Sequence, residues 1–344
     1  MKNKCECVVK FSESDYEYMA RALRLAKKGL YTAHPNPRVG CVIVKDEQIV
    51  GEGWHEYAGG PHAEVNALEQ AGDKAKGATV YVTLEPCCHE GKTPPCTEAL
   101  KKAGVAKVIA GMVDPHSRVA GNGLKELQDA GIEAASGLLE AQAEALNPGF
   151  IKRMRFGRPY VRLKLASSLD GRTAMASGES KWITSEAARL DVQRLRARST
   201  AILTGVGTVL ADDPSMTVRS EEVREQPLRV VVDTHLSMPA TAKMIKEPGE
   251  TIVFTCSENE GKAELEAAGA KVYMMPFCAT DVDLESVLDL MGEMEVNEVL
   301  VETGATLSGA FMQAGLIDEL VIYQAPIIMG DGARPLFRLP GLEK

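Results

Sequence analysis

Strand-like and helical patterns alternate along almost the whole chain, and this alternation limits the possible folds more than any other feature. Apolar runs such as residues 39–44 and 79–83 are followed by segments with helical spacing, such as 62–71 and 96–103. Strands that alternate with helices predict an α/β fold, in which helices cover a largely buried sheet. The first helix is expected to begin near Ser14, because Glu17 follows at the spacing of a capping box.

The pattern is interrupted once, by a locally basic stretch between Asn147 and Pro159 that contains Pro-Gly and Gly-Arg-Pro steps. Because 344 residues exceed one typical core, we expect two domains, 1–157 and 158–344. We favour a solvated connector over a phosphate contact for the basic stretch. After it, strands are predicted at 160–165, 201–204, 229–233, 251–255, 271–275, 298–302 and 320–323, and helices at 185–197, 263–268 and 284–291.

Composition excludes several classes of protein. A net charge of −9 argues against a nucleic-acid binder, which needs clustered lysine and arginine. No apolar run approaches the ~20 residues that span a bilayer, and the N-terminus lacks the pattern of a secretory signal. Eight cysteines are too dilute for a disulfide scaffold. We therefore expect a cytoplasmic protein without nucleic-acid or membrane partners.

One imidazole and two thiols match the chemistry of a catalytic zinc site, although eight residues separate the two cysteines where the known pattern has two. His62 opens a predicted helix, Cys87 follows a predicted strand, and Cys96 follows after eight residues. These three ligands would leave zinc a fourth position for water, whose pKa the metal lowers towards ~7. Glu64, two residues from His62, would then move protons from that water to departing ammonia. The pattern predicts a zinc-dependent hydrolytic deaminase with one zinc per chain.

A closed structural zinc site is the alternative, with Cys88 as the fourth ligand. Adjacent cysteines are awkward ligands for one ion, and a structural site has no use for Glu64. We therefore favour the catalytic interpretation.

Three motifs of the first half closely resemble those of the bifunctional riboflavin-biosynthesis deaminase–reductases. They are His34-Pro35-Asn36-Pro37-Arg38-Val39-Gly40, His62-Ala63-Glu64-Val65, and Glu85-Pro86-Cys87 with Thr93-Pro94-Pro95-Cys96. The resemblance implies a cytidine-deaminase-like α/β/α sandwich in which His62, Cys87 and Cys96 bind zinc and Glu64 is the proton shuttle. It also implies substrate contacts at Asn36, His55, His89 and Lys92, although His55 and His89 could be ordinary surface histidines. Cys88 departs from the family, which commonly has serine there.

Two glycine-containing segments of the second half could bind a nucleotide. Residues 304–310 follow a predicted strand and open a helix, whose N-terminal amides suit a diphosphate. Gly205-Val206-Gly207 resembles the start of a dinucleotide fingerprint, but Leu210 occupies the third glycine position. A tight turn between strand and helix explains each segment almost as well.

The second half also resembles the reductase part of the same family, through Ser168-Leu169-Asp170-Gly171-Arg172 and Gly178-Glu179-Ser180-Lys181-Trp182-Ile183-Thr184 among other segments. This implies a dihydrofolate-reductase-like α/β domain that binds NADPH. The implied cofactor contacts are Ala166, Trp182, Thr208, Asp212, Thr234, Gly304, Ala305, Thr306, Leu307, Ser308, Gly309 and Ala310. The implied substrate contacts are Lys164, Ser180, Arg196, Met216, Arg219 and Glu302, with Arg196 and Arg219 offering bidentate bonds to a phosphate.

The resemblance implies two consecutive reactions in riboflavin biosynthesis. The substrate, 2,5-diamino-6-ribosylamino-4(3H)-pyrimidinone 5′-phosphate, is deaminated, and NADPH then reduces its ribosyl group to ribityl. Family analogy implies a homodimer or higher homo-oligomer through the reductase domain. Family members usually continue beyond residue 344, so the last reductase strand or strands are expected to be missing here.

Two other functions stay open at this point. A nucleic-acid base deaminase joined to an unrelated domain is disfavoured by the acidic charge and by the absence of aromatic clusters. A zinc-stabilised binding module without catalysis would not need Glu64.

Overall fold

The computed structural model describes residues 10–90, 94–116, 119–180, 183–220, 222–278 and 281–341. The chain forms two compact units, Met1–Arg155 (unit 1) and Phe156–Lys344 (unit 2). Among the described residues, no helix combines the length and the apolar character needed to cross a membrane.

Unit 1 is built on a five-stranded sheet with the order β2-β1-β3-β4-β5. Strand β1 is antiparallel to β2 and β3, while β3, β4 and β5 are parallel. The β1–β2 hairpin turns at Asp46 and Glu47, which both have positive φ, as a two-residue type I′ turn requires. The elements are α1 (Glu13–Ala26), η1 (Lys27–Gly29), β1 (Gly40–Lys45), β2 (Gln48–Trp54), α2 (Ala63–Ala71), η2 (Gly72–Ala75), β3 (Thr79–Val82), α3 (Cys96–Ala103), β4 (Lys107–Ala110), α4 (Asn122–Asp129), β5 (Glu133–Ser136), α5 (Glu140–Leu146) and α6 (Pro148–Phe156).

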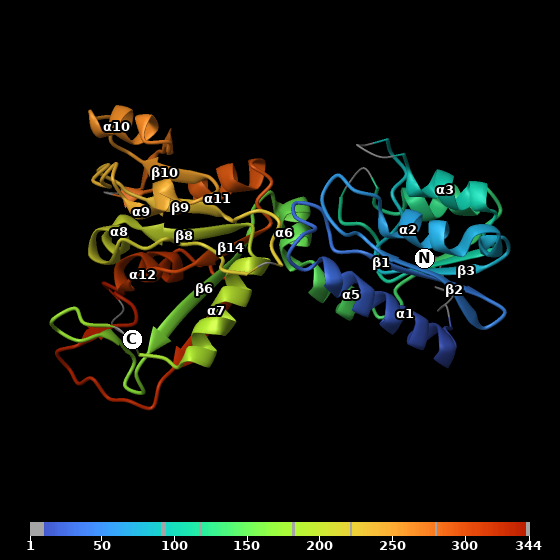
Figure 1. Ribbon diagram of the computed structural model, residues 1–344, viewed down its shortest axis with the longest axis horizontal. Coiled ribbons are helices and arrows are strands. Elements are labelled where there is room, and N and C mark those ends of the chain that lie inside the picture. Colours follow the sequence, from blue (N-terminus) through green and yellow to red (C-terminus); the bar gives the residue numbers. More distant parts are fainter. Residues whose placement is uncertain are drawn as a thin grey trace, which may run out of the picture. The chain divides into compact units, whose positions relative to one another are not determined.

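Helices cover both faces of this sheet (Figure 1). Alanines of α2 pack with Leu100 of α3 and Leu127 of α4 against one face, where Ile43 and Val108 point. On the other face, α1 and α5 pack against the neighbouring side chains of the same strands. Because strand side chains alternate between faces, two separate cores form. The predicted α/β/α sandwich is confirmed.

Two local predictions in unit 1 are wrong. The first helix is capped by Ser12 and not by Ser14: the Ser12 hydroxyl accepts from the Asp15 amide, and the Asp15 carboxylate accepts from the Ser12 amide. The basic stretch, predicted as a solvated connector, contains helix α6. Pro148 is its first residue, a position at which proline has no amide to lose.

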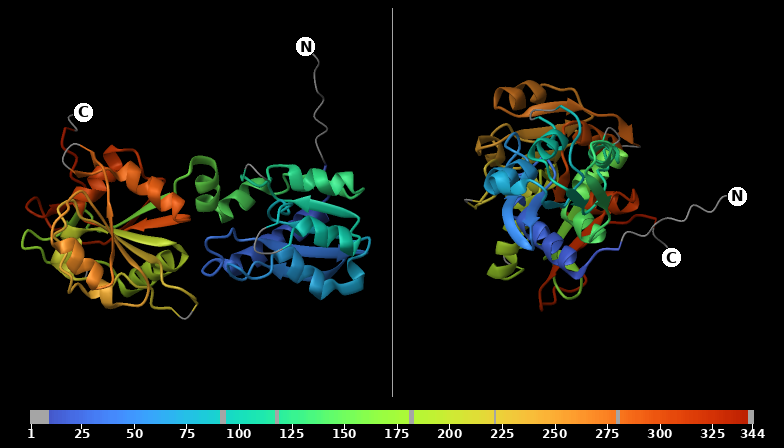
Figure 2. Two further views of the ribbon diagram at one scale, coloured as in Figure 1. Left: turned by 90° about the horizontal axis from the view of Figure 1, so that it is seen from above. Right: turned by 90° about the vertical axis from the view of Figure 1, so that its right-hand side faces the viewer.

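Unit 2 is built on a seven-stranded parallel sheet with the order β11-β10-β9-β8-β14-β6-β15. Helices lie on both of its faces (Figure 2). This agrees with the predicted reductase-type α/β domain. The elements are β6 (Tyr160–Ser167), β7 (Arg172–Ala174), α7 (Glu186–Arg198), β8 (Ala201–Gly205), α8 (Val206–Asp212), β9 (Leu228–Val232), α9 (Lys243–Lys246), β10 (Thr251–Thr255), α10 (Gly261–Ala267), β11 (Lys271–Met274), β12 (Phe277–Cys278), β13 (Asp281–Val282), α11 (Leu284–Glu293), β14 (Glu298–Val301), α12 (Ala305–Gln313), β15 (Glu319–Gln324) and β16 (Arg334–Pro335).

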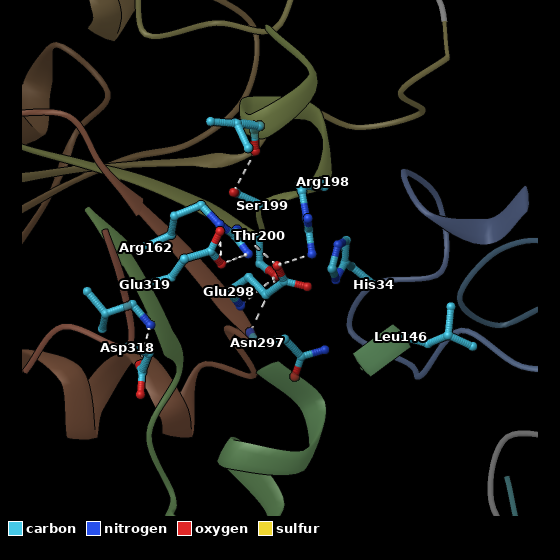
Figure 3. Close-up of polar contacts among 12 residues, drawn as sticks. His34, Leu146, Arg162, Arg198, Ser199, Thr200, Asn297, Glu298, Asp318 and Glu319 are labelled. Carbon is cyan, nitrogen blue, oxygen red and sulfur yellow. Dashed lines mark hydrogen bonds and ion pairs between the residues drawn. The ribbon is translucent and has the colours of Figure 1, made fainter. Parts of the chain in front are cut away.

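A buried ion network crosses three neighbouring strands of unit 2 (Figure 3). Arg162 and Glu298 are each about 1 % exposed, and Arg162 Nη1 lies 3.2 Å from Glu298 Oε2. Arg162 Nη2 lies 2.8 Å from Glu319 Oε2. Arg198 of α7 adds a second cation, 3.4 Å from Glu298 Oε2. Burial opposes the charge of Arg162, but hydrogen bonding to Glu319 and the charge of Glu298 raise its pKa above the usual value.

Candidate active sites

Three side chains of unit 1 bring their ligand atoms to one point. His62 immediately precedes α2, Cys87 lies in the loop after β3, and Cys96 is the first residue of α3. His62 Nδ1 lies 3.2 Å from Cys96 Sγ and 3.5 Å from Cys87 Sγ. The three ligand atoms all lie within 4.8 Å of one another, close enough to hold one metal ion. This is the group of potential metal ligands found among the described residues.

These distances suit zinc. A tetrahedral zinc, with bonds of about 2.3 Å to sulfur and about 2.0 Å to nitrogen, sets these ligands roughly 3.5 Å apart. Hydrogen bonds from Cys96 and His62 lower the pKa of Cys87 to about 4, so this sulfur is held as a thiolate. The Cys96 amide, at the N-terminus of α3, also donates to Cys87 Sγ at 3.3 Å. The donor set therefore fits a zinc ion and needs no fourth protein ligand.

Glu64 lies beside the three ligands and is buried. It occupies the first turn of α2 and is 4 % exposed. Burial raises its pKa above the usual value, and its carboxyl group also interacts with His62 and hydrogen-bonds to Cys96. A buried carboxyl group with a raised pKa is suited to taking up and releasing a proton.

Asn36 and His55 form an ordered hydrogen-bond chain. His55 Nδ1 lies 3.0 Å from the carbonyl oxygen of Pro61, which can only accept, so Nδ1 carries the proton. His55 Nε2 then accepts from Asn36 Nδ2 at 3.0 Å, and burial lowers the pKa of His55, which favours this neutral form. His55 is 3 % exposed and is therefore not the surface histidine left open by the sequence.

Of the two other predicted deaminase substrate contacts, the structure describes His89. His89 is exposed and stacks on His116, with ring centroids 6.2 Å apart. Lys92 lies outside the described residues.

Glu85 has a structural role that the sequence did not reveal. Its buried carboxylate accepts the amides of Asp114 and Gly121 on Oε2, at 3.0 and 2.8 Å, and the amide of Leu124 on Oε1, at 3.1 Å. These bonds hold the segment after β4 against the loop that carries Cys87. The fit is tight, because a Cβ at Gly123 would lie 2.1 Å from the Pro86 carbonyl oxygen. The sequence feature that could have indicated this role is the position of Glu85 directly before Pro86-Cys87.

Asp114 gives unit 1 a pH-dependent stability. Burial, with the nearby charge of Glu85, raises its pKa from 3.8 to about 6. Because the folded state binds this proton more tightly than the unfolded chain does, the free energy of unfolding falls as the pH rises between these two values. Asp114→Asn is therefore expected to raise the free energy of unfolding by about 2–3 kcal/mol above pH 6. At about pH 4 the variant and the wild type should be equally stable, because Asp114 is then protonated in the folded state.

Urea unfolding at several pH values measures this effect, read from Trp54 fluorescence in a Trp182→Phe background. Asp73→Asn, at an exposed position of unit 1, is the control and should change the free energy by less than about 0.5 kcal/mol at every pH. An Asp114→Asn effect that does not vary with pH would contradict the assignment.

The predicted cofactor residues that the structure describes lie at one edge of the unit 2 sheet. They follow the carboxyl ends of parallel strands, where open α/β sheets bind their ligands. The β8–α8 turn touches the β14–α12 turn, since the Gly205 amide donates to Thr303 Oγ1 at 3.3 Å. The Ser308 hydroxyl donates to the Gly304 carbonyl within α12. Ala166 lies in β6, Thr208 and Asp212 in α8, Thr234 after β9, and Gly304 to Ala310 at the start of α12, while Trp182 lies outside the described residues.

Three predicted substrate residues form one cluster. Arg196 of α7 holds Glu302 with both arms, Nε to Oε1 at 2.6 Å and Nη2 to Oε2 at 3.1 Å. Lys164 Nζ lies 3.9 Å from Glu302 Oε2. One edge of the Arg196 guanidinium is thus used within the protein and is not open for the bidentate phosphate contact that the sequence suggested.

The remaining substrate predictions lie in two loops. Met216 is buried, Arg219 is exposed, and the Arg219 amide donates to Gln193 of α7 at 3.0 Å. Ser180 lies in the loop before α7.

Two unpredicted residues adjoin the Lys164 cluster. Lys164 Nζ lies 5.8 Å from the ring centroid of Tyr323 on β15, and the Tyr323 hydroxyl donates to Asp191 of α7 at 2.6 Å. Asp191 and Tyr323 are far apart in sequence, so no local pattern indicates their contact.

Comparisons with known proteins match both units. The profile of the RibD C-terminal domain matches residues 159–344, and that of the cytidine and deoxycytidylate deaminase zinc-binding region matches residues 12–112. The riboflavin biosynthesis protein RibD of Escherichia coli is 54 % identical, over 96 % of this chain and 92 % of its own length. The chain belongs to the RibD family. The RibD protein of Haemophilus influenzae is 49 % identical, over 98 % of this chain and 92 % of its own.

Solved structures of RibD proteins share the fold. Acinetobacter baumannii RibD, form 1, superposes with a TM-score of 0.89 at 51 % identity, covering 95 % of this chain and 90 % of that one. A diaminohydroxyphosphoribosylaminopyrimidine deaminase/5-amino-6-(5-phosphoribosylamino)uracil reductase from Thermotoga maritima superposes with a TM-score of 0.85 at 39 % identity, covering 94 % and 90 %. The RibD fold therefore extends over both units of this chain.

Proposed function

We propose that this chain deaminates 2,5-diamino-6-ribosylamino-4(3H)-pyrimidinone 5′-phosphate in a domain of residues 1–157 and reduces the product with NADPH in a domain of residues 158–344. As a member of the RibD family it is a riboflavin-biosynthesis enzyme with deaminase and reductase activities. The observation that carries the proposal is the convergence of His62, Cys87 and Cys96 beside buried Glu64.

In the deaminase, His62, Cys87 and Cys96 would hold one zinc ion, which would supply Lewis-acid activation of a water molecule. Glu64 takes a proton from the attacking water and delivers it to the leaving amino group, which departs as ammonia. The bond between His55 and Asn36 Nδ2 leaves Asn36 Oδ1 to accept a hydrogen bond from a substrate N–H group. His89 and Lys92 complete the proposed substrate contacts.

In the reductase, the described cofactor residues would hold NADPH, which would supply the hydride that converts the ribosyl group to ribityl. Amides at the N-terminus of α12, from Gly304 onward, suit the cofactor's diphosphate. The other proposed cofactor contacts are Ala166, Trp182, Thr208, Asp212, Thr234 and the residues up to Ala310. Lys164, Ser180, Arg196, Met216, Arg219 and Glu302 are the proposed substrate contacts, with exposed Arg219 directed to the phosphate.

We also propose that the chain self-associates through its reductase domain. Among the described residues, strand β15 is the last strand of its sheet, and its Leu320 and Ile322 are 41 % and 44 % exposed. An unpaired edge with apolar side chains favours pairing with a second copy. Sedimentation equilibrium tests this, and a monomer at micromolar concentration would contradict it.

The acidic net charge supports a small-molecule partner and not a nucleic acid. Thiolate ligands and a nicotinamide reductant suit the reducing conditions of the cytoplasm, where we propose that both reactions occur.

The decisive experiment separates the two reactions. Given the diaminopyrimidine ribotide, the purified chain is expected to release ammonia without NADPH and to oxidise NADPH only after deamination. His62→Ala should lose the zinc, about one per chain, and the ammonia release, while still reducing the deaminated ribotide. Metal analysis and the two assays check this. A zinc-free wild-type protein that releases ammonia at full rate would overturn the metal assignment.

A further inference from the structure

The ammonium group of Lys164 is confined by side chains from two neighbouring strands. Lys164 lies on β6, Glu302 follows β14, and Tyr323 lies on β15, and these three strands are adjacent in the sheet. The Lys164 side chain is 16 % exposed, with Glu302 on one side and the Tyr323 ring on the other. The cation therefore has an anion and an aromatic face as neighbours.

Glu302 alone does not fix the position of the Lys164 ammonium group. Both of its oxygens already accept from Arg196, at 2.6 and 3.1 Å, whereas Lys164 Nζ stands 3.9 Å away. A lysine has a flexible four-carbon stem, so one distant and shared carboxylate leaves several rotamers open. The face of an aromatic ring attracts a cation and restricts where its stem can lie.

Asp191 holds the Tyr323 ring in place. The Tyr323 hydroxyl donates to Asp191 Oδ2 at 2.6 Å, which ties β15 to α7. Burial and this hydrogen bond raise the pKa of Tyr323, so the hydroxyl remains a donor at neutral pH. Helix α7 thus supplies Arg196 to orient Glu302 and Asp191 to orient Tyr323.

We propose that Tyr323, held by Asp191, is a positioning residue of the reductase that keeps the Lys164 ammonium directed at the substrate. This inference rests on the proposed function, which places Lys164 at the reductase substrate. Neither Tyr323 nor Asp191 needs to touch substrate or cofactor, because both act through Lys164.

Steady-state reduction of the deaminated ribotide by the full chain tests the proposal. Tyr323→Leu is expected to lower kcat about tenfold with the KM for NADPH unchanged, and Tyr323→Phe, which keeps the ring, about threefold. Asp191→Asn retains an acceptor oxygen, so its kcat should remain near the wild-type value. Asp191→Leu removes the acceptor, so its kcat should fall as far as that of Tyr323→Phe. Ammonia release, measured on the same preparations, should be unchanged.

The matched control is Tyr160, the first residue of β6. Its ring also faces a cation, with the Arg162 guanidinium carbon 5.5 Å from the ring centroid. Tyr160→Phe should leave reductase kcat unchanged.

A double-mutant cycle distinguishes an effect of Tyr323 that acts through Lys164 from a general loss of stability. In a Lys164→Met background, Tyr323→Leu should lower kcat no further. A wild-type kcat for Tyr323→Leu, or an equal fold loss with and without Lys164, would overturn the inference while leaving the proposed function intact. A wild-type kcat for Lys164→Met would instead remove Lys164 from the proposed function.

Discussion

Replacing Glu64 by glutamine is expected to slow ammonia release by about 10²–10⁴-fold, the usual contribution of a general acid–base group. Glutamine matches glutamate in size and can hydrogen-bond, but it cannot take up and release the proton. Because Glu64 is buried beside the ligands and is not one of them, zinc content should not change. Reduction of the deaminated ribotide should also proceed at the wild-type rate.

Glu69→Gln is the matched control, because Glu69 lies on the same helix and is exposed. It should leave ammonia release unchanged. If Glu64→Gln lost its zinc, Glu64 would be a ligand and the proton-shuttle role would be wrong. If Glu64→Gln kept both its zinc and its deaminase rate, a structural zinc site would be the better explanation.

Arg162→Met is expected to destabilise unit 2 by about 3–5 kcal/mol, because it leaves a buried carboxylate without its nearest cation. Glu298 is about 1 % exposed, and its ion pair with Arg198, at 3.4 Å, is longer than its ion pair with Arg162, at 3.2 Å. Denaturant unfolding followed by circular dichroism measures the loss, with the unit 1 transition as an internal reference. Adding Glu298→Gln should recover at least half of the stability, since it removes the buried charge that Arg162 compensates.

Arg229 provides a matched control for the same substitution. It is also about 1 % exposed, but its guanidinium donates to neutral oxygens, namely Thr251 Oγ1 and the carbonyls of Glu247, Pro248 and Gly249. Arg229→Met therefore leaves no carboxylate without its partner and should lower the free energy of unfolding less than Arg162→Met does. Equal losses at the two positions would show that burial of the long side chain, and not the charge it neutralises, sets the cost.

The zinc cluster and the fold class could be predicted from sequence because both depend on local patterns. The chemistry of zinc limits the ligands to a few residue types, and these stand at the ends of a strand and two helices that periodicity already indicates. The ligand atoms of His62, Cys87 and Cys96 lie together in the structure, within 4.8 Å of one another. The glycine turn before α12 was likewise visible, because a strand precedes it and a helix follows.

Features that depend on distant partners could not be predicted. Arg196 looked like a phosphate ligand, but its fork holds Glu302, 106 positions away in sequence. Tyr323 and Asp191 are separated by 132 positions, and neither has an unusual neighbourhood. Helix α6 could not be predicted for a local reason: Pro148 interrupts the sequence pattern, although proline is compatible with a first helical position.

The contact between Gly123 and Pro86 links metal uptake to a residue that has no side chain. Even a methyl group at position 123 would push against the Pro86 carbonyl and so displace the neighbouring sulfur of Cys87. Gly123→Ala is therefore expected to weaken zinc binding, a defect that excess metal would relieve. Zinc affinity would therefore depend on a glycine outside the proposed coordinating residues.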